Sequence, residues 1–191
     1  CPFCAVPETR GREVSRPTIE ILDEVKSLVE RDYKSITLLG QNVNSYGLDK
    51  KGEEIGFPEL LRKIGEIGKS SGKEFWVYFT SPHPRDMSDK VIEVIAEFPC
   101  LAKQIHLPIQ SGDDKVLIRM NRKYNVEKYG EIVKTIRRLI PEATLFTDII
   151  VGFTGETDEQ FENTRKAMYD FNYNMAYIDQ YSQRPGAVSS R

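Results

Sequence analysis

Two cysteines at the start of the chain have a spacing that suits a metal cluster or a redox dithiol. The chain begins Cys1-Pro2-Phe3-Cys4, and Pro7 follows closely. A redox dithiol normally lies at the start of a helix, which Pro7 would interrupt early. A zinc site needs a second Cys/His pair, which these residues do not supply. An iron–sulfur site needs further thiolates, which would have to precede residue 1. A chain that begins inside such a motif is expected to be a piece of a longer polypeptide.

Polar residues also follow each segment that is predicted to be a strand. These five segments are 40–44, 80–85, 108–112, 152–156 and 181–184. In parallel α/β architectures, ligands bind where the strands end. A single polar loop has no special meaning, but five at one edge predict a binding site. The sequence has no Gly-x-Ser-x-Gly elbow, which argues against a Ser-His-Asp hydrolase.

A few side chains stand out within the predicted strands and their exits. Asp148 interrupts an apolar strand, so it either anchors a structural network or holds a ligand. Its place in the half of the strand nearer the carboxyl end favours the ligand. His83 and His106 are isolated in the sequence, and structural roles are expected for both. Trp76 and its aromatic neighbours are expected to form a core strand.

Hydrophobic periodicity predicts the elements that position these residues. Helices are expected at 17–29, 59–67, 89–97, 115–120, 126–139 and 158–169, and strands at 36–39, 75–79, 104–107, 145–151 and 176–181. No hairpin turn joins adjacent strands, so the strands should be parallel with right-handed helical crossovers. Such a sheet is either doubly wound or an incomplete barrel. The lack of Gly-x-Gly-x-x-Gly after the first strand weakens the dinucleotide-binding version.

The composition is that of one globular domain. The chain has 191 residues, of which 39% are hydrophobic, and 27 basic against 29 acidic residues leave a net charge of -2. These values exclude a disordered chain, a polyacidic tail and a wholly basic nucleic-acid coat. No apolar run approaches the ~20 residues that span a bilayer. Three cysteines are too few for a disulfide framework. A soluble, cytoplasmic protein with no membrane association and no stable protein partner is expected.

Several motifs together carry a family resemblance over nearly the whole chain. They are the segments Cys1 to Cys4, 9–17, 38–46, 81–84, 106–112, 120–124, 148–153 and 181–182. The chain resembles the radical S-adenosylmethionine methylthiotransferases, in particular the tRNA-modifying branch. The resemblance implies a partial (β/α)6 TIM-like open barrel of the radical SAM type, with the first strand missing. Residues 1–191 would be the radical SAM core domain, without the family's N-terminal methylthiotransferase domain and C-terminal TRAM-like RNA-binding domain.

The same resemblance implies two cofactors. Three cysteines spaced Cys-x3-Cys-x2-Cys hold a [4Fe–4S] cluster in this family, so Cys1 and Cys4 would be metal ligands and the third cysteine would lie four positions before residue 1. The residues expected to bind S-adenosylmethionine are Gln41, Asn42, Ser81, Gln110, Arg122 and Asp148. Arg122 can clamp a carboxylate with two hydrogen bonds, and an ionised Asp148 can accept from an ammonium or a ribose hydroxyl.

The implied reaction inserts a methylthio group into an isopentenylated adenosine of tRNA. A 5′-deoxyadenosyl radical from S-adenosylmethionine would remove hydrogen from an adenine carbon, and a second S-adenosylmethionine would methylate the inserted sulfur. The segment 40–46 favours tRNA over the ribosomal-protein aspartate that the sister branch modifies.

Local charge gives weak independent support for a tRNA partner. Residues 103–138 hold nine Lys/Arg against four Asp/Glu, and Arg10, Arg12 and Arg16 form a second basic cluster. A solvated helix face would explain part of the first cluster equally well. A non-catalytic RNA-binding module with a vestigial cluster site is an alternative from another class.

Overall fold

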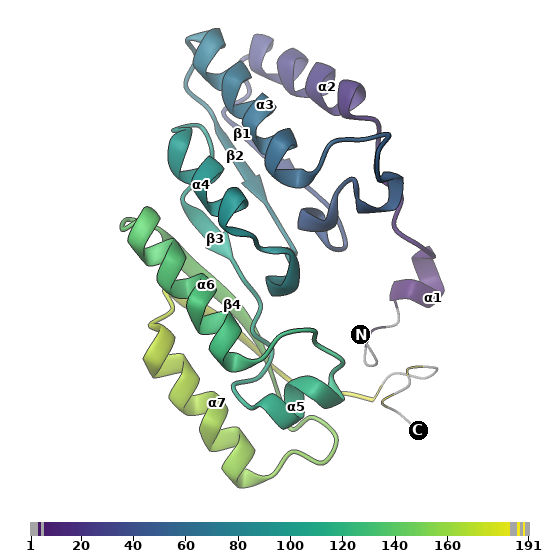
Figure 1. Ribbon diagram of the computed structural model, residues 1–191, viewed down its shortest axis with the longest axis vertical. Helices are drawn as coiled ribbons and strands as arrows, with labels where there is room; N and C mark the ends of the chain where they lie inside the picture. The colour runs from purple at the N-terminus through teal and green to yellow at the C-terminus, as the bar shows by residue number, and fades with distance from the viewer. Residues whose placement is uncertain (1–3, 5, 184–186, 188, 190–191) are drawn as a thin grey trace.

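The structure is a computed structural model that describes the chain except for residues 1–3, 5, 184–186, 188 and 190–191. Strands and helices alternate along it (Figure 1). The α-helices are α1 (Val6–Arg10), α2 (Thr18–Glu30), α3 (Phe57–Ser71), α4 (Asp89–Glu97), α5 (Asp114–Arg119), α6 (Val126–Leu139) and α7 (Asp158–Phe171). The strands are β1 (Ser35–Leu38), β2 (Trp76–Phe79), β3 (Gln104–His106), β4 (Thr144–Val151) and β5 (Met175–Gln180). Short 3-10 helices are η1 (Val43–Ser45), η2 (Leu48–Lys50) and η3 (Pro84–Asp86).

All strand pairs in the described part of the chain are parallel, as predicted. β1 pairs with β2, and β3, β4 and β5 form a second group in that order. A parallel bridge between Val77 and Leu101 joins the two groups just ahead of β3. The spatial order therefore follows the chain order without the reversal that marks a doubly wound sheet. This arrangement confirms the open, partial barrel of βα units.

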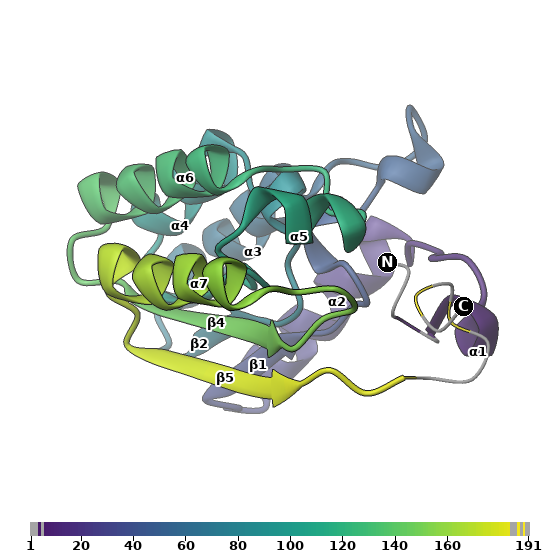
Figure 2. The same cartoon turned by 90° about the horizontal axis from the view of Figure 1, so that it is seen from below.

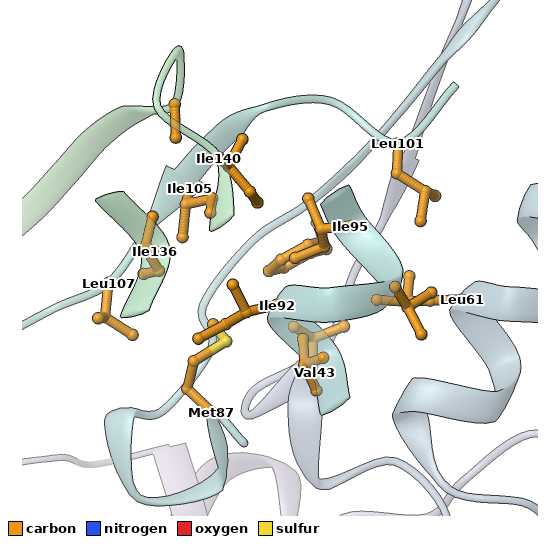
Figure 3. Packing of buried hydrophobic residues seen from close by; sticks show 14 of the residues in the cluster. Val43, Leu61, Met87, Ile92, Ile95, Leu101, Ile105, Leu107, Ile136 and Ile140 are labelled. Carbon is orange, nitrogen blue, oxygen red and sulfur yellow. The ribbon is translucent and has the colours of Figure 1, made fainter. Parts of the chain in front are cut away.

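The hydrophobic core lies between the sheet and the helices α3, α4 and α6. Buried aliphatic side chains from strands and helices interdigitate there, as Figure 3 shows for Ile92, Ile95 and Ile105. The ring of Phe79 on β2 meets Phe57 of α3 edge-on at 5.4 Å between centroids. Burial of these apolar surfaces is the main favourable contribution to folding.

The opposite face of the sheet is more open, and the position of Trp76 on it differs from the expected core position. Residues alternate between the two faces of a strand. On β2, Val77 is 1% exposed against the helices, whereas Trp76 is 42% exposed on the other face. Trp76 is therefore not a core residue, although Phe75 and Phe79 beside it are buried.

A second correction concerns the segment after the cysteine pair. Pro7 is expected to interrupt a helix early there, yet α1 runs from Val6 to Arg10. Proline is tolerated in the first turn, because the N–H groups of that turn have no partner within the helix. β4 and β5 point with their carboxyl ends toward α1 (Figure 2), so the flank of Cys4 lies at that edge of the sheet. Among the described helices, none is long and apolar enough to cross a bilayer.

Candidate functional site

The loops after β1 and β2 are tied to each other at the carboxyl edge of the sheet. Asn44 is buried, and its side chain binds both backbone polar groups of His83 in the second loop: Nδ2 donates to the carbonyl of His83 (3.0 Å), and Oδ1 accepts from the His83 N–H (2.7 Å). Asn42 adds a second tie, because its Nδ2 donates to Oδ2 of Asp86 (3.0 Å). Two amide side chains thus set the relative position of the first two strand exits.

A cavity of about 460 Å³ opens beside these loops. It is lined by residues that include Gln41, Asn42, Arg12 and Arg85. Gln41 is exposed, whereas Asn42 is half-buried and its Oδ1 has no hydrogen-bond partner within the described chain. Ser81 is exposed in a left-handed backbone conformation (φ 57°) and does not line this cavity.

Gln110 and Asp148 lie side by side where β3 meets β4. The N–H of Gln110 donates to the Asp148 carbonyl (2.8 Å), and the Gln110 carbonyl accepts from the N–H of Ile150 (2.9 Å). Gln110 has a left-handed backbone (φ 71°), which is unusual for a residue with a side chain. Its Oε1 is buried and has no hydrogen-bond partner within the described residues.

Asp148 has a partner that spacing in the sequence did not reveal. Its Oδ1 is 2.8 Å from Nε2 of His106, and its side chain is 32% exposed on the open face of the sheet. The His106 ring in turn meets Tyr177 of β5 edge-on at 6.1 Å. His106 is thus not isolated. The described residues contain no group of three or more His, Cys, Asp or Glu side chains placed to hold a metal ion.

Arg122 is anchored under the loop that carries Gln110. Its Nε donates to the hydroxyl of Tyr124 (3.0 Å), and its Nη2 is 3.5 Å from the carbonyl of Pro108. Burial raises the pKa of the Tyr124 hydroxyl, so this group stays protonated at neutral pH and acts as a donor. Tyr124 also meets His83 edge-on at 5.6 Å, which connects this cluster with the second strand exit.

His83 is a neutral group in this setting. Burial, followed by the positive charges of Arg122 and Arg85, lowers the pKa of His83 to about 3. Nδ1 of His83 accepts from the Arg85 N–H (3.1 Å), which places the ring proton on Nε2. The ring is therefore an uncharged hydrogen-bond donor at neutral pH.

Three contributors to this edge were missed by reasoning from the sequence. Asn44 and Tyr124 lie within motifs that carry the family resemblance, but their contacts depend on loops distant in sequence. Glu156 accepts from the N–H of Gly152 through Oε2, and its Oε1 is buried without a partner among the described residues. The Gly-x-x-Gly-Glu pattern after β4 was the available signal, because glycines permit a tight turn that folds a carboxylate back.

The donor and acceptor types at this edge fit the amino-acid and ribose portions of S-adenosylmethionine. The buried oxygens of Asn42 and Gln110 need hydrogen-bond donors, which an ammonium or hydroxyl group of a ligand would supply. A guanidinium at Arg122 suits a carboxylate. Of the two expected cluster ligands, Cys4 is half-buried and forms no disulfide with a cysteine that the structure describes, and Cys1 lies outside the described residues.

Part of the local excess of basic residues is used inside the fold. Lys103 donates from Nζ to the carbonyl of Phe98 (3.0 Å), and burial lowers the pKa of this amine. Arg137 donates to the carbonyls of Ala143 (3.0 Å) and Asn172 (2.8 Å). These two cations hold loops of this chain, so the count of charges overstates the phosphate-binding capacity of this region.

Known sequences match most or all of the chain. The profile of the Radical SAM superfamily matches residues 1–168. Relatives named tRNA-2-methylthio-N(6)-dimethylallyladenosine synthase are 48% identical over 191 residues in Phocaeicola vulgatus, 49% over 190 in Streptomyces avermitilis and 47% over 191 in Clostridium botulinum. Each alignment covers 100% of this chain, but only 41%, 36% and 41% of the respective relative. The chain thus spans less than half the length of the relatives it matches.

Solved structures show the same fold at low sequence identity. A radical S-adenosylmethionine methyltransferase, TsrM from Kitasatospora setae with cobalamin and a [4Fe-4S] cluster bound, superposes with a TM-score of 0.77 at 15% identity, over 100% of this chain and 36% of that one. Coproporphyrinogen III oxidase (HemN) from Escherichia coli gives 0.68 at 14% identity, over 100% and 43%. These two likenesses support the barrel architecture alone.

Proposed function

The chain belongs to the Radical SAM superfamily, and we propose that it is the central domain of a tRNA methylthiotransferase, a tRNA-2-methylthio-N(6)-dimethylallyladenosine synthase. The observation that carries this proposal is the 47–49% identity to relatives of that name, in alignments that cover 100% of this chain. The substrate would be the isopentenylated adenosine of a tRNA, which would place the activity in the cytoplasm.

The proposed division of labour follows the geometry of the carboxyl edge. Gln41, Asn42 and Gln110 would meet the amino-acid end of S-adenosylmethionine, because two of them present buried oxygens without partners in the described chain. Arg122 would take the carboxylate, and Asp148 an ammonium or ribose hydroxyl. Ser81, although outside the cavity beside Gln41, would contribute from the exit of β2.

The cluster would be held by Cys1, Cys4 and a third cysteine upstream. The bound cluster and S-adenosylmethionine supply the one-electron chemistry that breaks an unactivated C–H bond, while the protein binds, orients and shields. The half-buried Cys4 comes two residues before α1, and α1 lies on the side of the sheet where β4 and β5 end (Figure 2). Cys4 would therefore lie at the edge that carries the polar strand exits.

The decisive experiment uses the full-length protein with its clusters reconstituted under anaerobic conditions. Incubation with S-adenosylmethionine, a reductant and tRNA that carries isopentenyladenosine should convert that nucleoside into its methylthio derivative, detected by mass spectrometry of digested tRNA. A Cys4→Ala variant is the control and should give no product. Modification of a ribosomal protein instead of tRNA would assign the sister activity. Cluster incorporation without any cleavage of S-adenosylmethionine would contradict the enzymatic proposal.

A further inference from the structure

Tyr124 is a buried tyrosine that has not been given a role in binding. It is 9% exposed and lies between the end of α5 and the start of α6. Its hydroxyl makes three contacts: it accepts from Nε of Arg122 (3.0 Å) and faces the carbonyls of Pro108 (3.1 Å) and Ile109 (2.8 Å). The single phenolic proton is shared between the two carbonyls, and a lone pair receives the guanidinium N–H.

These contacts link two parts of the site that are far apart in the chain. Pro108 and Ile109 lead directly into Gln110, whose buried Oε1 has no partner within the described residues. The guanidinium carbon of Arg122 also lies 5.5 Å from the centroid of the Tyr124 ring. The Tyr124 side chain therefore contacts the Arg122 guanidinium both through its hydroxyl and through its ring. The same hydroxyl also contacts the backbone carbonyls that precede Gln110.

The backbone at this point depends on side chains because it leaves the sheet. Regular β3–β4 pairing stops at His106, and the next bridge is between Gln110 and Ile149. In between, the N–H of Ile109 donates to Oγ1 of Thr147 (2.9 Å) rather than to a backbone carbonyl. Hydroxyl groups thus replace the ladder here, and the hydroxyl of Tyr124 contacts the two carbonyls directly before Gln110.

We propose that Tyr124 is a positioning residue for S-adenosylmethionine, which orients the guanidinium of Arg122 and the amide of Gln110 toward the carboxylate and ammonium of the cofactor. The inference rests on the proposed function, because it takes that cofactor as the ligand. A planar guanidinium binds a carboxylate well only in one orientation. Fixing Nε fixes the plane of the whole group.

The chain supplies a matched control in Tyr129. This tyrosine is 0% exposed, and its hydroxyl donates to the carbonyl of Leu107 (2.7 Å) in the same segment. It accepts from the hydroxyl of Tyr173 (3.0 Å) and has no contact with Arg122 among its hydrogen bonds. Tyr129→Phe therefore removes a buried hydroxyl of the same kind without releasing the guanidinium.

The test measures binding of S-adenosylmethionine to the full-length, cluster-loaded protein by equilibrium dialysis. Tyr124→Phe should raise the Kd about tenfold, equivalent to about 1.4 kcal/mol, whereas Tyr129→Phe should stay within about twofold of wild type at a similar loss of Tm. With 5′-methylthioadenosine, which lacks the amino-acid end, Tyr124→Phe should bind like wild type. In an Arg122→Gln background, Tyr124→Phe should add a smaller loss than it causes in wild type, because only its effect on Gln110 remains.

A second variant keeps the inference testable if Tyr124→Phe does not fold. Arg122→Lys retains the positive charge at a half-buried position but lacks the Nε–H group that donates to the Tyr124 hydroxyl. It should lose about as much affinity for S-adenosylmethionine as Tyr124→Phe does. Full affinity in either variant overturns the inference, as does equal weakening of S-adenosylmethionine and 5′-methylthioadenosine. Wild-type protein that fails to bind S-adenosylmethionine overturns the proposed function and this inference together. Wild-type binding with indistinguishable Tyr124→Phe and Tyr129→Phe overturns the inference alone.

Discussion

At the scale of single residues, Asp148 shows how a polar group can lie within an apolar strand. Thr147 and Ile149 on either side are buried, whereas Asp148 points to the open face and contacts His106 at 2.8 Å. A carboxylate in this position needs a partner, since an unpaired charge is costly to bury. The contact occupies one oxygen of Asp148, and the proposed cofactor contact concerns the other.

Replacing that carboxylate separates its two possible roles. Asp148→Asn keeps the shape and removes the charge, so the Kd for S-adenosylmethionine should rise about tenfold, since a charge-assisted hydrogen bond contributes about 1.5 kcal/mol or more. The Tm should change little, because the side chain is a third exposed. Calorimetric titration and a thermal scan measure the two quantities. Unchanged affinity together with a lowered Tm would make Asp148 a structural residue.

At the scale of elements, the two faces of β2 differ sharply. Val77 packs under the helices and Trp76 lies on the open face. Val77→Ala should therefore lower the free energy of unfolding by about 2 kcal/mol, from lost burial and the cavity that remains. Trp76→Phe should change it by less than about 0.5 kcal/mol, as at most surface positions. Urea denaturation compares the pair, and a larger loss for Trp76→Phe would contradict the assignment of faces.

The turn after Gln110 is packed against α7 without spare room. A Cβ at Gly112 would lie 2.6 Å from Cα of Thr164 and 2.7 Å from the carbonyl oxygen of Asn163, both of which are backbone atoms. Gly112→Ala should thus destabilise the fold by about 1–3 kcal/mol through overpacking. Gly56→Ala is the control, since a Cβ there meets nothing closer than Cδ of Pro58 at 3.7 Å. Equal stability of both variants would show that α7 shifts to make room for the added methyl group.

The elements were largely predictable from sequence, and the contacts of the site were not. Periodicity located α4 and α6 at their observed bounds, because each helix buries one continuous apolar stripe. The contact between His106 and Asp148 could not be predicted, because it depends on β3 and β4 being neighbours in the sheet and not on the spacing of residues in the sequence. Tyr124 escaped notice for a similar reason: two of its three partners, Pro108 and Ile109, lie in an earlier loop that the tertiary fold brings to it.

At the scale of the whole molecule, His83 makes stability depend on pH. Its pKa falls from 6.5 to about 3 on folding, through burial and the charges of Arg122 and Arg85, with Asp86 opposing them. The unfolded chain therefore takes up a proton below pH 6.5 that the folded protein refuses until about pH 3, so stability is lost as the pH falls through that window. The slope from this group is at most about 1.4 kcal/mol per pH unit, reduced by solvent screening of a partly exposed ring.

In a variant without the His83 ring, the free energy of unfolding should depend less on pH. His83→Asn should lose less stability than wild type between pH 6.5 and pH 3.5, because asparagine takes up no proton there. Chemical denaturation at several pH values gives the comparison. Parallel profiles for the two proteins would mean that carboxylates alone govern the acid loss of stability.

The parallel sheet also has a consequence for how the chain acquires its structure during synthesis. β1 pairs with β2 in a register that joins Ser35 to Trp76, and β3 pairs with β4 through Gln104 and Thr144, so each pair closes a loop of about 40 residues. No strand can form a rapid local hairpin, which predicts slow folding. At roughly 5–20 residues per second, β1 waits about 2–8 s after it is made before its partner strand exists. During that interval the ribosome-bound chain carries Ile36 and Leu38, the apolar residues of β1, without their partner strand, and β1 can pair only after β2 has been made.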